Sequence, residues 1–396
     1  MSATLAKGSL PIDPLRRSMA PGVAGLPPAR WSAAFDEAAY RHEAARSNAD
    51  LIPRPLAILL HMPPEGHPER LMREIELVAR LFDRDRDATT LYVDGTGQRT
   101  LVAHDLEVLA RSLDRHFHFS PQARRRFTVG VSARAVRRGD LAACASLGFE
   151  CVRLAADGAV PDTARAIETA RREGVRTIAV DTAIADQRAA RDIVGLRPDT
   201  VTFTFPEAVT FDAAWEDLER LAALLAAEGY GRIGLDLRAL PWLDAAGPLR
   251  LSAVASTAPP RQPDMQVDQV GLGIGAVSRI HDAVSQNFPD AERWQQALDA
   301  AGLPVWRGHV LDADEQLRMD VIGELLRTGA VAIDTIARRY DVDFHRYFSQ
   351  ELERLHGSFG DLVTSRPDRL EATSQGHLAL RIMAACFDRT GARPPP

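Results

Sequence analysis

Short apolar segments alternate with amphipathic segments along the middle of the chain, one pair about every 20 to 30 residues from residue 55 onward. The apolar segments have the length of buried strands, and the amphipathic ones space their apolar residues as a helix does. Strands are predicted at residues 56–61, 90–93, 127–132, 151–154, 176–180, 200–205 and 232–236. Helices are predicted between them, at about 68–82, 102–116, 137–147, 162–173, 186–195 and 212–228.

This alternation of strand and helix is the signature of parallel βα units. Six or seven units follow one another without a long insertion or a sign of reversed strand order. Apart from this βα period, the sequence has no internal repeat. That pattern favours an α/β fold with a full or partial (β/α) barrel over an open doubly wound sheet. Ligands bind at the C-terminal ends of barrel strands, so the loops after the strands are where chemistry is expected.

The segments on either side of the repeating part differ from it. Residues 1–30 are rich in Pro, Ala and Gly and are expected to be disordered or loosely draped, and residues 31–47 have helical spacing with Ser32 as a candidate N-cap. Four regions are expected: 1–50 as an extension and helix, 51–240 as the barrel, 241–289 as a linker and glycine-rich barrel edge, and 290–396 as a helical C-terminal domain similar to a winged helix.

Composition and charge exclude several classes of protein. A net charge of -6 and a pI near 6.0 argue against nucleic-acid binding, which needs a clustered basic field. No apolar run approaches the length of a membrane span and the N-terminus has no hydrophobic signal region, so a cytoplasmic protein is expected. The three cysteines, at 144, 151 and 386, form no CxxC or CxxxCxxC motif and supply no self-contained thiolate site.

The loops after the strands hold the first candidate residues. His61 ends the first strand, and the second is followed by "DGTGQ", where Gly95 and Gly97 would let backbone amides approach an anion beside Asp94. Each also has an ordinary structural interpretation, as a hydrogen-bonded histidine and a tight turn. Carboxylates follow two later strands, at Asp181 and Asp236, the second with Arg238 close by; a ligand-binding role and an N-cap role both remain open.

The densest glycine feature is "GLGIGAVSRI" at residues 271–280. It resembles a dinucleotide-binding fingerprint only superficially, because no ribose-binding βαβ unit follows it. Glycines that allow close backbone contact with a ligand or with the barrel edge are the better interpretation. The pair His116 and His118 lacks an identifiable third metal ligand, and no catalytic triad can be singled out.

Residues 267–326 resemble the closing part of oxygen-independent coproporphyrinogen III oxidases, which are radical S-adenosylmethionine enzymes. The family has a glycine-rich run, a "QN" pair, an "RG" pair and an acidic-basic helix. The matching positions here are Gly271, Gly273, Gly275, Ser278, Ser285, Gln286, Asn287, Pro304, Trp306, Arg307, Gly308, Asp314, Glu315, Arg318, Asp320, Val321 and Ile322. Weaker similarity extends back to about residue 30, where "RPLAILLHMPP" is similar to the family's first-strand phrase.

The resemblance implies a partial (β/α) barrel that holds a [4Fe-4S] cluster and S-adenosylmethionine, with a helical domain over the site, and the oxidative decarboxylation of porphyrinogen propionates. The family ligates its cluster with a CxxxCxxC loop directly after strand one. Here that strand runs through Pro63 and Pro64 into a helix at Pro68, and the loop contains no cysteine. The resemblance therefore identifies a divergent member without the cluster motif, and no catalytic or metal-binding residue is predicted.

Three hypotheses follow. The first is a cluster-free pseudoenzyme that binds a tetrapyrrole, such as haem or a porphyrin, or a protein partner such as an active paralogue. The second is an active coproporphyrinogen III oxidase of porphyrin biosynthesis. The third is a repurposed barrel with non-radical chemistry on Asp94, Asp181, Asp236 or His61. The candidate pocket comprises these four residues with Gly95, Gly97, Arg238, Gly271, Gly273, Gly275, Ser278, Gln286, Asn287 and Arg307.

Overall fold

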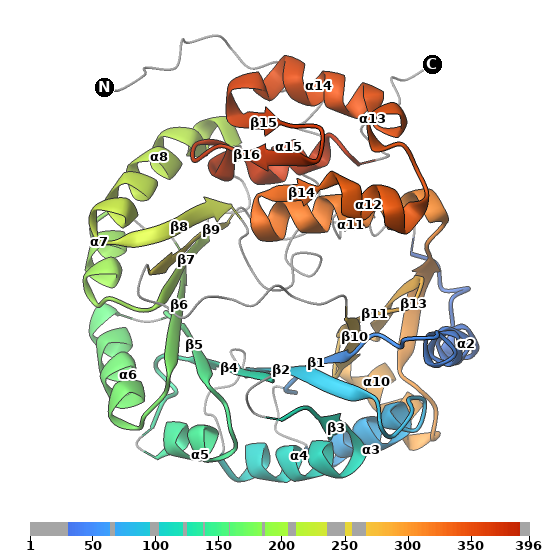
Figure 1. Cartoon of the computed structure of the whole chain (residues 1–396). Helices are drawn as coiled ribbons and strands as arrows, with labels where there is room; N and C mark the ends of the chain where they lie inside the picture. Colours follow the sequence, from blue (N-terminus) through green and yellow to red (C-terminus); the bar gives the residue numbers. More distant parts are fainter. Residues whose placement is uncertain are drawn as a thin grey trace.

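In the computed structural model the strands and helices alternate as the hydrophobic pattern predicts (Figure 1). The structure describes residues 31–63, 68–95, 103–121, 125–137, 139–157, 159–183, 187–204, 211–235, 250–255 and 267–388. The segment 1–30, for which disorder is expected, lies outside these ranges, as do Gly97, Asp236 and Arg238.

All seven predicted barrel strands form, and each agrees with its predicted range to within three residues. They are β1 (Leu56–His61), β2 (Asp87–Gly95), β4 (Arg126–Ser132), β5 (Cys151–Ala155), β6 (Thr177–Ala183), β7 (Thr200–Thr204) and β8 (Tyr230–Leu235). The helices between them are α3 (Pro68–Ala79), α4 (Ala103–His116), α5 (Asp140–Ser146), α6 (Val160–Arg172), α7 (Gln187–Gly195) and α8 (Phe211–Ala227). A short strand, β3 (His118–Phe119), pairs with the start of β2.

The strands build one strongly curved sheet in the order β13-β12-β11-β10-β1-β2-β4-β5-β6-β7-β9-β8. From β10 (Asp268–Leu272) to β7 all pairs are parallel. Because β13 (Val305–Val310) and β8 end the sheet without pairing with each other, the barrel is partial and open along one side. This confirms the predicted fold class.

The two edges of the sheet are antiparallel. The segment expected to be a linker contains β9 (Arg250–Ala255), which lies between β7 and β8 and pairs antiparallel with both, so β8 is not a parallel neighbour of β7 as the repeating pattern suggests. At the other edge β10, β11 (Val277–Ile280), β12 (Ala283–Asn287) and β13 form successive antiparallel pairs. Strand β13 extends the large sheet into the region expected to be a helical domain.

Helix α2 (Glu37–Asn48) begins later than predicted. Asp36, not Ser32, is its N-cap, and the Asp36 carboxylate accepts the amide of Ala39 at 3.1 Å. Ser32 instead pairs with Gly308 of β13 through two backbone hydrogen bonds of 2.8 and 3.0 Å. The N-cap prediction was wrong because Ser32 lies next to a distant strand, which helical spacing cannot reveal.

The C-terminal region combines helices with a small three-stranded sheet. Helix α10 (Ala291–Asp299) precedes β13, and α11 (Ala313–Thr328) follows it with a capping box made by Asp312 and Glu315. The remaining elements are β14 (Ala330–Ala332), α12 (Ile333–Tyr340), α13 (Phe344–Tyr347), α14 (Ser349–Phe359), η3 (Gly360–Leu362), β15 (Val363–Ser365), β16 (Arg369–Ala372), η4 (Gly376–Ala379) and α15 (Leu380–Ala385). The sequence of helix, strand, helices and β15–β16 hairpin is that of a winged helix.

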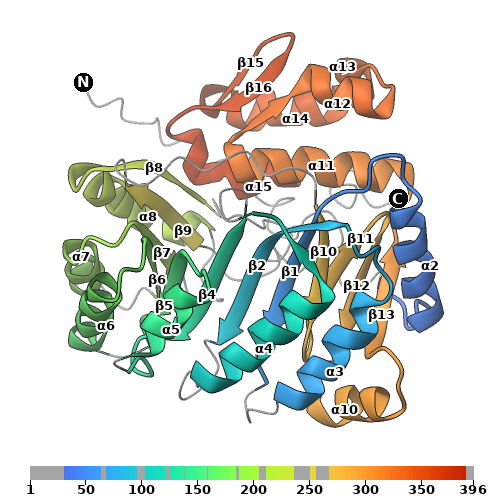
Figure 2. The same cartoon turned by 60° about the horizontal axis from the view of Figure 1, so that its bottom comes forward.

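The part of this region from α11 to α15 lies across the open side of the barrel (Figures 1 and 2). Near β8, both η4 and α15 contact the sheet edge. Near the other edge, Arg279 of β11 forms an ion pair of 3.1 Å with Asp320 of α11. The C-terminal region therefore joins the two edges of the curved sheet.

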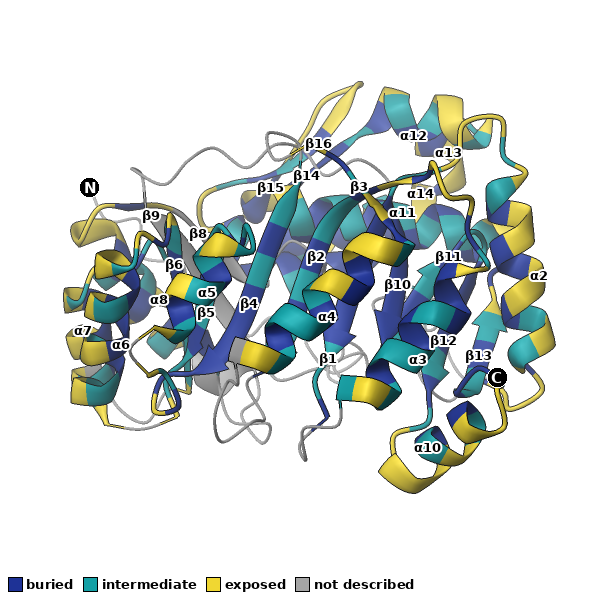
Figure 3. Cartoon of the chain, turned by 90° about the horizontal axis from the view of Figure 1, so that it is seen from below, coloured by how far each residue is buried: buried dark blue, intermediate teal, exposed yellow. Residues whose placement is uncertain are grey.

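The curved sheet has two chemically different faces. Its convex face is apolar and lies under the surrounding helices, whose outer surfaces carry the exposed positions (Figure 3). Because successive strand residues point to opposite faces, the alternate residues face the barrel interior. On the convex face the core is formed by Ile58, Leu60, Leu91, Val93, Val129, Val131, Val152, Leu154, Ile178, Val180, Val201, Phe203, Val270 and Leu272.

No helix in the described ranges is both long and apolar enough to cross a membrane.

Candidate ligand-binding face

The concave face of the sheet is polar. The residues that alternate with the convex core are mostly Thr, Ser, Asp, Arg and Gln, and most keep part of their surface exposed. They include Thr90, Tyr92, Asp94, Thr128, Ser132, Cys151, Arg153, Thr177, Asp181, Thr200, Thr202 and Gln269. Parallel barrel strands usually fill their interior with bulky apolar side chains, so this polar composition differs from that of a packed barrel core.

An ion pair lies on this face between neighbouring strands. The Arg153 guanidinium of β5 contacts both carboxylate oxygens of Asp181 on β6, with Nη2 to Oδ1 and to Oδ2 at 2.6 Å and Nε to Oδ2 at 3.1 Å. Burial alone would lower the pKa of Arg153, but the Asp181 carboxylate and then Tyr92 raise it above its usual value. Arg153 is the main residue that sequence reasoning missed, although its alternation with Val152 and Leu154 marks it as facing the interior.

His61 and Asp94 are partners in the register between β1 and β2. Burial lowers the pKa of His61 below 6.5, and the nearby Asp94 carboxylate opposes this change only partly. His61 is therefore mostly neutral at pH 7 and has one ring nitrogen that can accept a hydrogen bond. Gly95, the last residue of β2, is buried and pairs with Val131.

The glycine-rich segment is held by a buried carboxylate from outside the barrel. Glu74 of α3 accepts hydrogen bonds from the Gly273 amide at 2.9 Å, the Asn287 amide at 2.7 Å and the Trp294 indole at 2.9 Å. Asn287 also donates to the Gly273 carbonyl at 2.9 Å. A Cβ atom at Gly273, where φ is +105°, would collide with the carbonyl oxygen of His61, so glycine is required where this segment meets the end of β1.

The remaining candidates of this segment divide between the two faces. Ser278 and Asn287 lie on the convex side, where the Ser278 hydroxyl accepts the Gly271 amide at 2.9 Å and Asn287 contacts Glu74. Gly271 itself approaches the Val277 backbone too closely for a side chain. Gly275 donates its amide to the Phe288 carbonyl at 2.9 Å. Structural contacts thus account for these four of the predicted pocket residues.

Gln286 and Arg307 lie on the concave side, on paired strands. Arg307 donates from Nε and Nη2 to the Gln286 side-chain oxygen at 3.0 and 2.9 Å, and Gln286 donates to the Gly275 carbonyl at 3.3 Å. Arg307 lies over the rings of Trp306 and Trp31. The structure thus brings His61, Asp94, Asp181, Gln286 and Arg307 to one face of the sheet, while Gly97, Asp236 and Arg238 lie outside the described residues.

The three cysteines lie on different elements. Cys144 is buried in α5, where burial raises its pKa to about 12, and Cys386 is buried at the end of α15, where burial raises its pKa to about 11. Cys151 is half-buried on β5. Among the described residues, the one group with the spacing of metal ligands is Glu43, His281 and Asp282, which contains no thiol.

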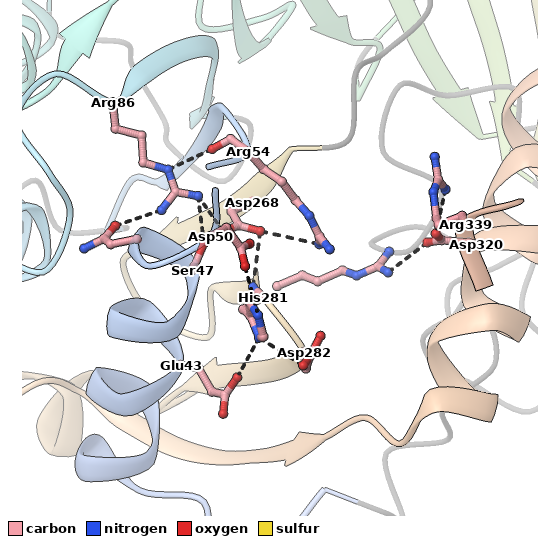
Figure 4. Close-up of polar contacts among 12 residues, drawn as sticks. Glu43, Ser47, Asp50, Arg54, Arg86, Asp268, His281, Asp282, Asp320 and Arg339 are labelled. Carbon is pink, nitrogen blue, oxygen red and sulfur yellow. Dashed lines mark hydrogen bonds and ion pairs between the residues drawn. The ribbon is translucent and has the colours of Figure 1, made fainter. Parts of the chain in front are cut away.

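That acidic group belongs to a network at the N-terminal ends of the strands (Figure 4). His281 Nδ1 lies 3.3 Å from Glu43 and 3.0 Å from Asp282, and Arg46 bridges the same two carboxylates. Next to it the buried Arg86 donates to Asp268 at 2.6 Å. Internal ion pairs therefore already compensate these charges, and the network ties α2 to the start of β2, β10 and the β11–β12 turn.

A cleft of about 420 Å³ opens on the outer surface between α3 and α4. His116 lines it, whereas His118 lies 3.6 Å from Asp87 instead. The cleft lies on the convex side of the barrel and shares no residue with the concave face.

Comparison with known proteins found no matching family model. An oxygen-independent coproporphyrinogen III oxidase of Pseudomonas aeruginosa is 26% identical over 360 residues, 81% of this chain and 78% of that protein. One from Synechocystis is 25% identical over 364 residues, 80% and 76% of the two chains. A solved structure described as coproporphyrinogen III oxidase from Escherichia coli, a radical SAM enzyme, matches with a TM-score of 0.77 and 19% identity, covering 93% of this chain and 97% of that one.

Proposed function

We propose that this chain, a divergent homologue of the oxygen-independent coproporphyrinogen III oxidases, binds a carboxylate-bearing tetrapyrrole on its concave face without radical chemistry. One observation carries the proposal: the three thiols lie on three separate elements, while the concave face keeps a continuous set of polar side chains.

The residues present do not fit a [4Fe-4S] cluster of the family's kind. Such a cluster needs three thiolates that converge from one loop, and residues 62–67 read Met-Pro-Pro-Glu-Gly-His. Cys144 and Cys386 are buried, and their raised pKa values favour the thiol over the thiolate that iron requires. Only Cys151 is on the concave face, and one thiolate cannot hold a cubane cluster.

The concave face suits a ligand with several polar groups. It offers hydroxyls from threonines on four strands, the guanidinium of Arg307, the Arg153–Asp181 pair and the neutral imidazole of His61. Apolar ring surface is partly exposed on Tyr92 and Trp306. A carboxylated tetrapyrrole combines a large ring with peripheral anions, and this is the class that the names of the homologues suggest.

The chief alternative is an active coproporphyrinogen III oxidase, which the similarity over 81% of the chain favours. Such an enzyme would have to hold its cluster with a set of ligands other than the CxxxCxxC loop that the family uses. A third function, non-radical chemistry on His61, Asp94 or Asp181, would use the same face. A protein partner, such as an active paralogue, would be recognised through the outer surface.

Anaerobic purification followed by absorption spectroscopy separates these functions. We expect no iron–sulfur absorption after reconstitution with iron and sulfide, and a saturable Soret shift when coproporphyrin III or haem is added. The variant C144S/C151S/C386S is the matched control for iron and sulfide uptake.

Stoichiometric iron and sulfide in the wild type, lost in the triple variant, would establish the active oxidase and refute the proposal. A wild-type protein that binds no porphyrin at micromolar concentration would refute tetrapyrrole binding. Co-purification with an active oxidase would then support the partner function.

A further inference from the structure

The guanidinium of Arg307 is held in a fixed position on the concave face. Its Nε and Nη2 atoms both donate to Gln286, and its central carbon lies 4.1 Å from the centre of the Trp306 ring and 5.3 Å from that of Trp31. Stacking and two hydrogen bonds to one oxygen restrict the side chain, and within the described residues no acceptor bonds to Nη1, which can donate to another group.

The charge of Arg307 is not compensated within the described part of the chain. No carboxylate there lies within ion-pair distance, in contrast to Arg86, Arg153 and Arg318, which have partners at 2.6, 2.6 and 2.8 Å. Burial lowers the pKa of Arg307, and no neighbouring charge opposes this. A partly desolvated cation without a counter-ion is unfavourable, and an anionic ligand would remove the penalty.

A second donor without a described acceptor belongs to Trp31, whose ring lies under the Arg307 guanidinium. Trp31 is 9% exposed, and its buried indole N–H has no acceptor in the described residues. Its ring packs against Val284 and Met319, and the pairing of Ser32 with Gly308 fixes it next to β13. A buried donor without an acceptor costs about 1–3 kcal/mol, so this N–H indicates a missing partner.

We propose that Arg307 and Trp31 form a subsite for a single carboxylate group, with Gln286 as the positioning residue for Arg307. One guanidinium matches a monoanion, and no lysine is present among the concave residues to neutralise a phosphate dianion. The identity of the whole ligand rests on the function proposed above, whereas the carboxylate preference of the subsite does not.

The first experiment tests the subsite independently of any tetrapyrrole. In 15N-labelled protein, the indole resonance of Trp31 should shift on addition of sodium propionate and stay in place with propionamide. Trp294, whose indole is bonded to Glu74, is the internal reference. The shift should disappear in R307Q and persist in R172Q, a surface arginine of α6 that serves as the matched control.

The second experiment uses coproporphyrin III. R307Q should weaken its binding about ten- to a hundredfold, and W31F, which keeps a ring but removes the N–H, about five- to tenfold. The tetramethyl ester should bind the wild type and R307Q equally, because it lacks carboxylates.

The subsite would be refuted if the Trp31 resonance does not shift on addition of propionate. It would also be refuted if R307Q binds coproporphyrin III as tightly as the wild type does. A response to propionate without any porphyrin binding would support the subsite and refute the tetrapyrrole function. The two proposals can therefore fail separately.

Discussion

Replacing Glu74 with glutamine tests how the glycine-rich segment is held against the barrel. Glu74 is 1% exposed, and burial raises its pKa from 4.5 to about 7 against the opposing effect of three N–H donors, from Gly273, Trp294 and Asn287. Glutamine has nearly the shape of the protonated side chain and cannot ionise. E74Q therefore isolates the effect of the Glu74 charge on stability.

The sign and size of the expected stability difference between E74Q and the wild type follow from the pKa of Glu74. Because the folded-state pKa lies above the unfolded value, the stability that this group contributes is complete below pH 4.5 and is lost as pH rises through about 7. At about 1.4 kcal/mol per pH unit, the difference between 4.5 and about 7 corresponds to about 3.5 kcal/mol. E74Q should match the wild type at pH 5 and exceed its free energy of unfolding by up to that amount at pH 8.

Urea unfolding followed by circular dichroism at several pH values measures this difference. The matched control is E76Q on the same helix, where Glu76 forms only surface ion pairs and substitution should change stability by less than about 0.5 kcal/mol. If E74Q is instead less stable than the wild type at pH 8, the three hydrogen bonds outweigh burial and the reasoning about the sign is wrong.

Further predictions concern other contacts of the barrel. G273A should lower the free energy of unfolding by at least about 2 kcal/mol, because its Cβ would collide with backbone, whereas G323A in α11, where space is open, should be neutral or slightly stabilising. D181N should lower the free energy of unfolding by about 2–3 kcal/mol, because it leaves Arg153 without its partner. R153L/D181L should lower the free energy of unfolding by less than D181N does, and equal losses would contradict this prediction. D320N should destabilise the chain at neutral pH, and this penalty should fade in acid, because ion pairs and a hydrogen bond outweigh burial and lower the pKa of Asp320; thermal unfolding at several pH values would check it.

The sequence predicts the barrel strands well because apolar segments of strand length alternate with helical ones. It does not predict that β9 would separate β7 from β8, because "RLSAVA" lies in a Pro- and Ala-rich stretch and its antiparallel pairing depends on contacts distant in sequence. The start of α2 is misplaced for the same reason, since Ser32 pairs with β13.

The candidate site is predicted only in part. Residues at strand ends, such as His61 and Asp94, are marked by position alone, and both lie on the concave face. Which side of β11 and β12 faces the interior depends on where α2 and α3 pack, so sequence cannot separate Gln286 from its neighbour Asn287. Trp31 lies far from Arg307 in sequence, and the Ser32–Gly308 pairing holds it next to β13, where Arg307 lies over its ring.

The polar concave face is difficult to explain by stability. Replacing an inward-facing ion pair with packed apolar side chains is often neutral or stabilising, so the Arg153–Asp181 pair is weak evidence of a stabilising role. Arg307 also gives no evidence of a stabilising role, because its charge has no counter-ion among the described residues. Side chains that a stable barrel does not require are gathered on its interior face, and these are the side chains that the ligand binding proposed above would use.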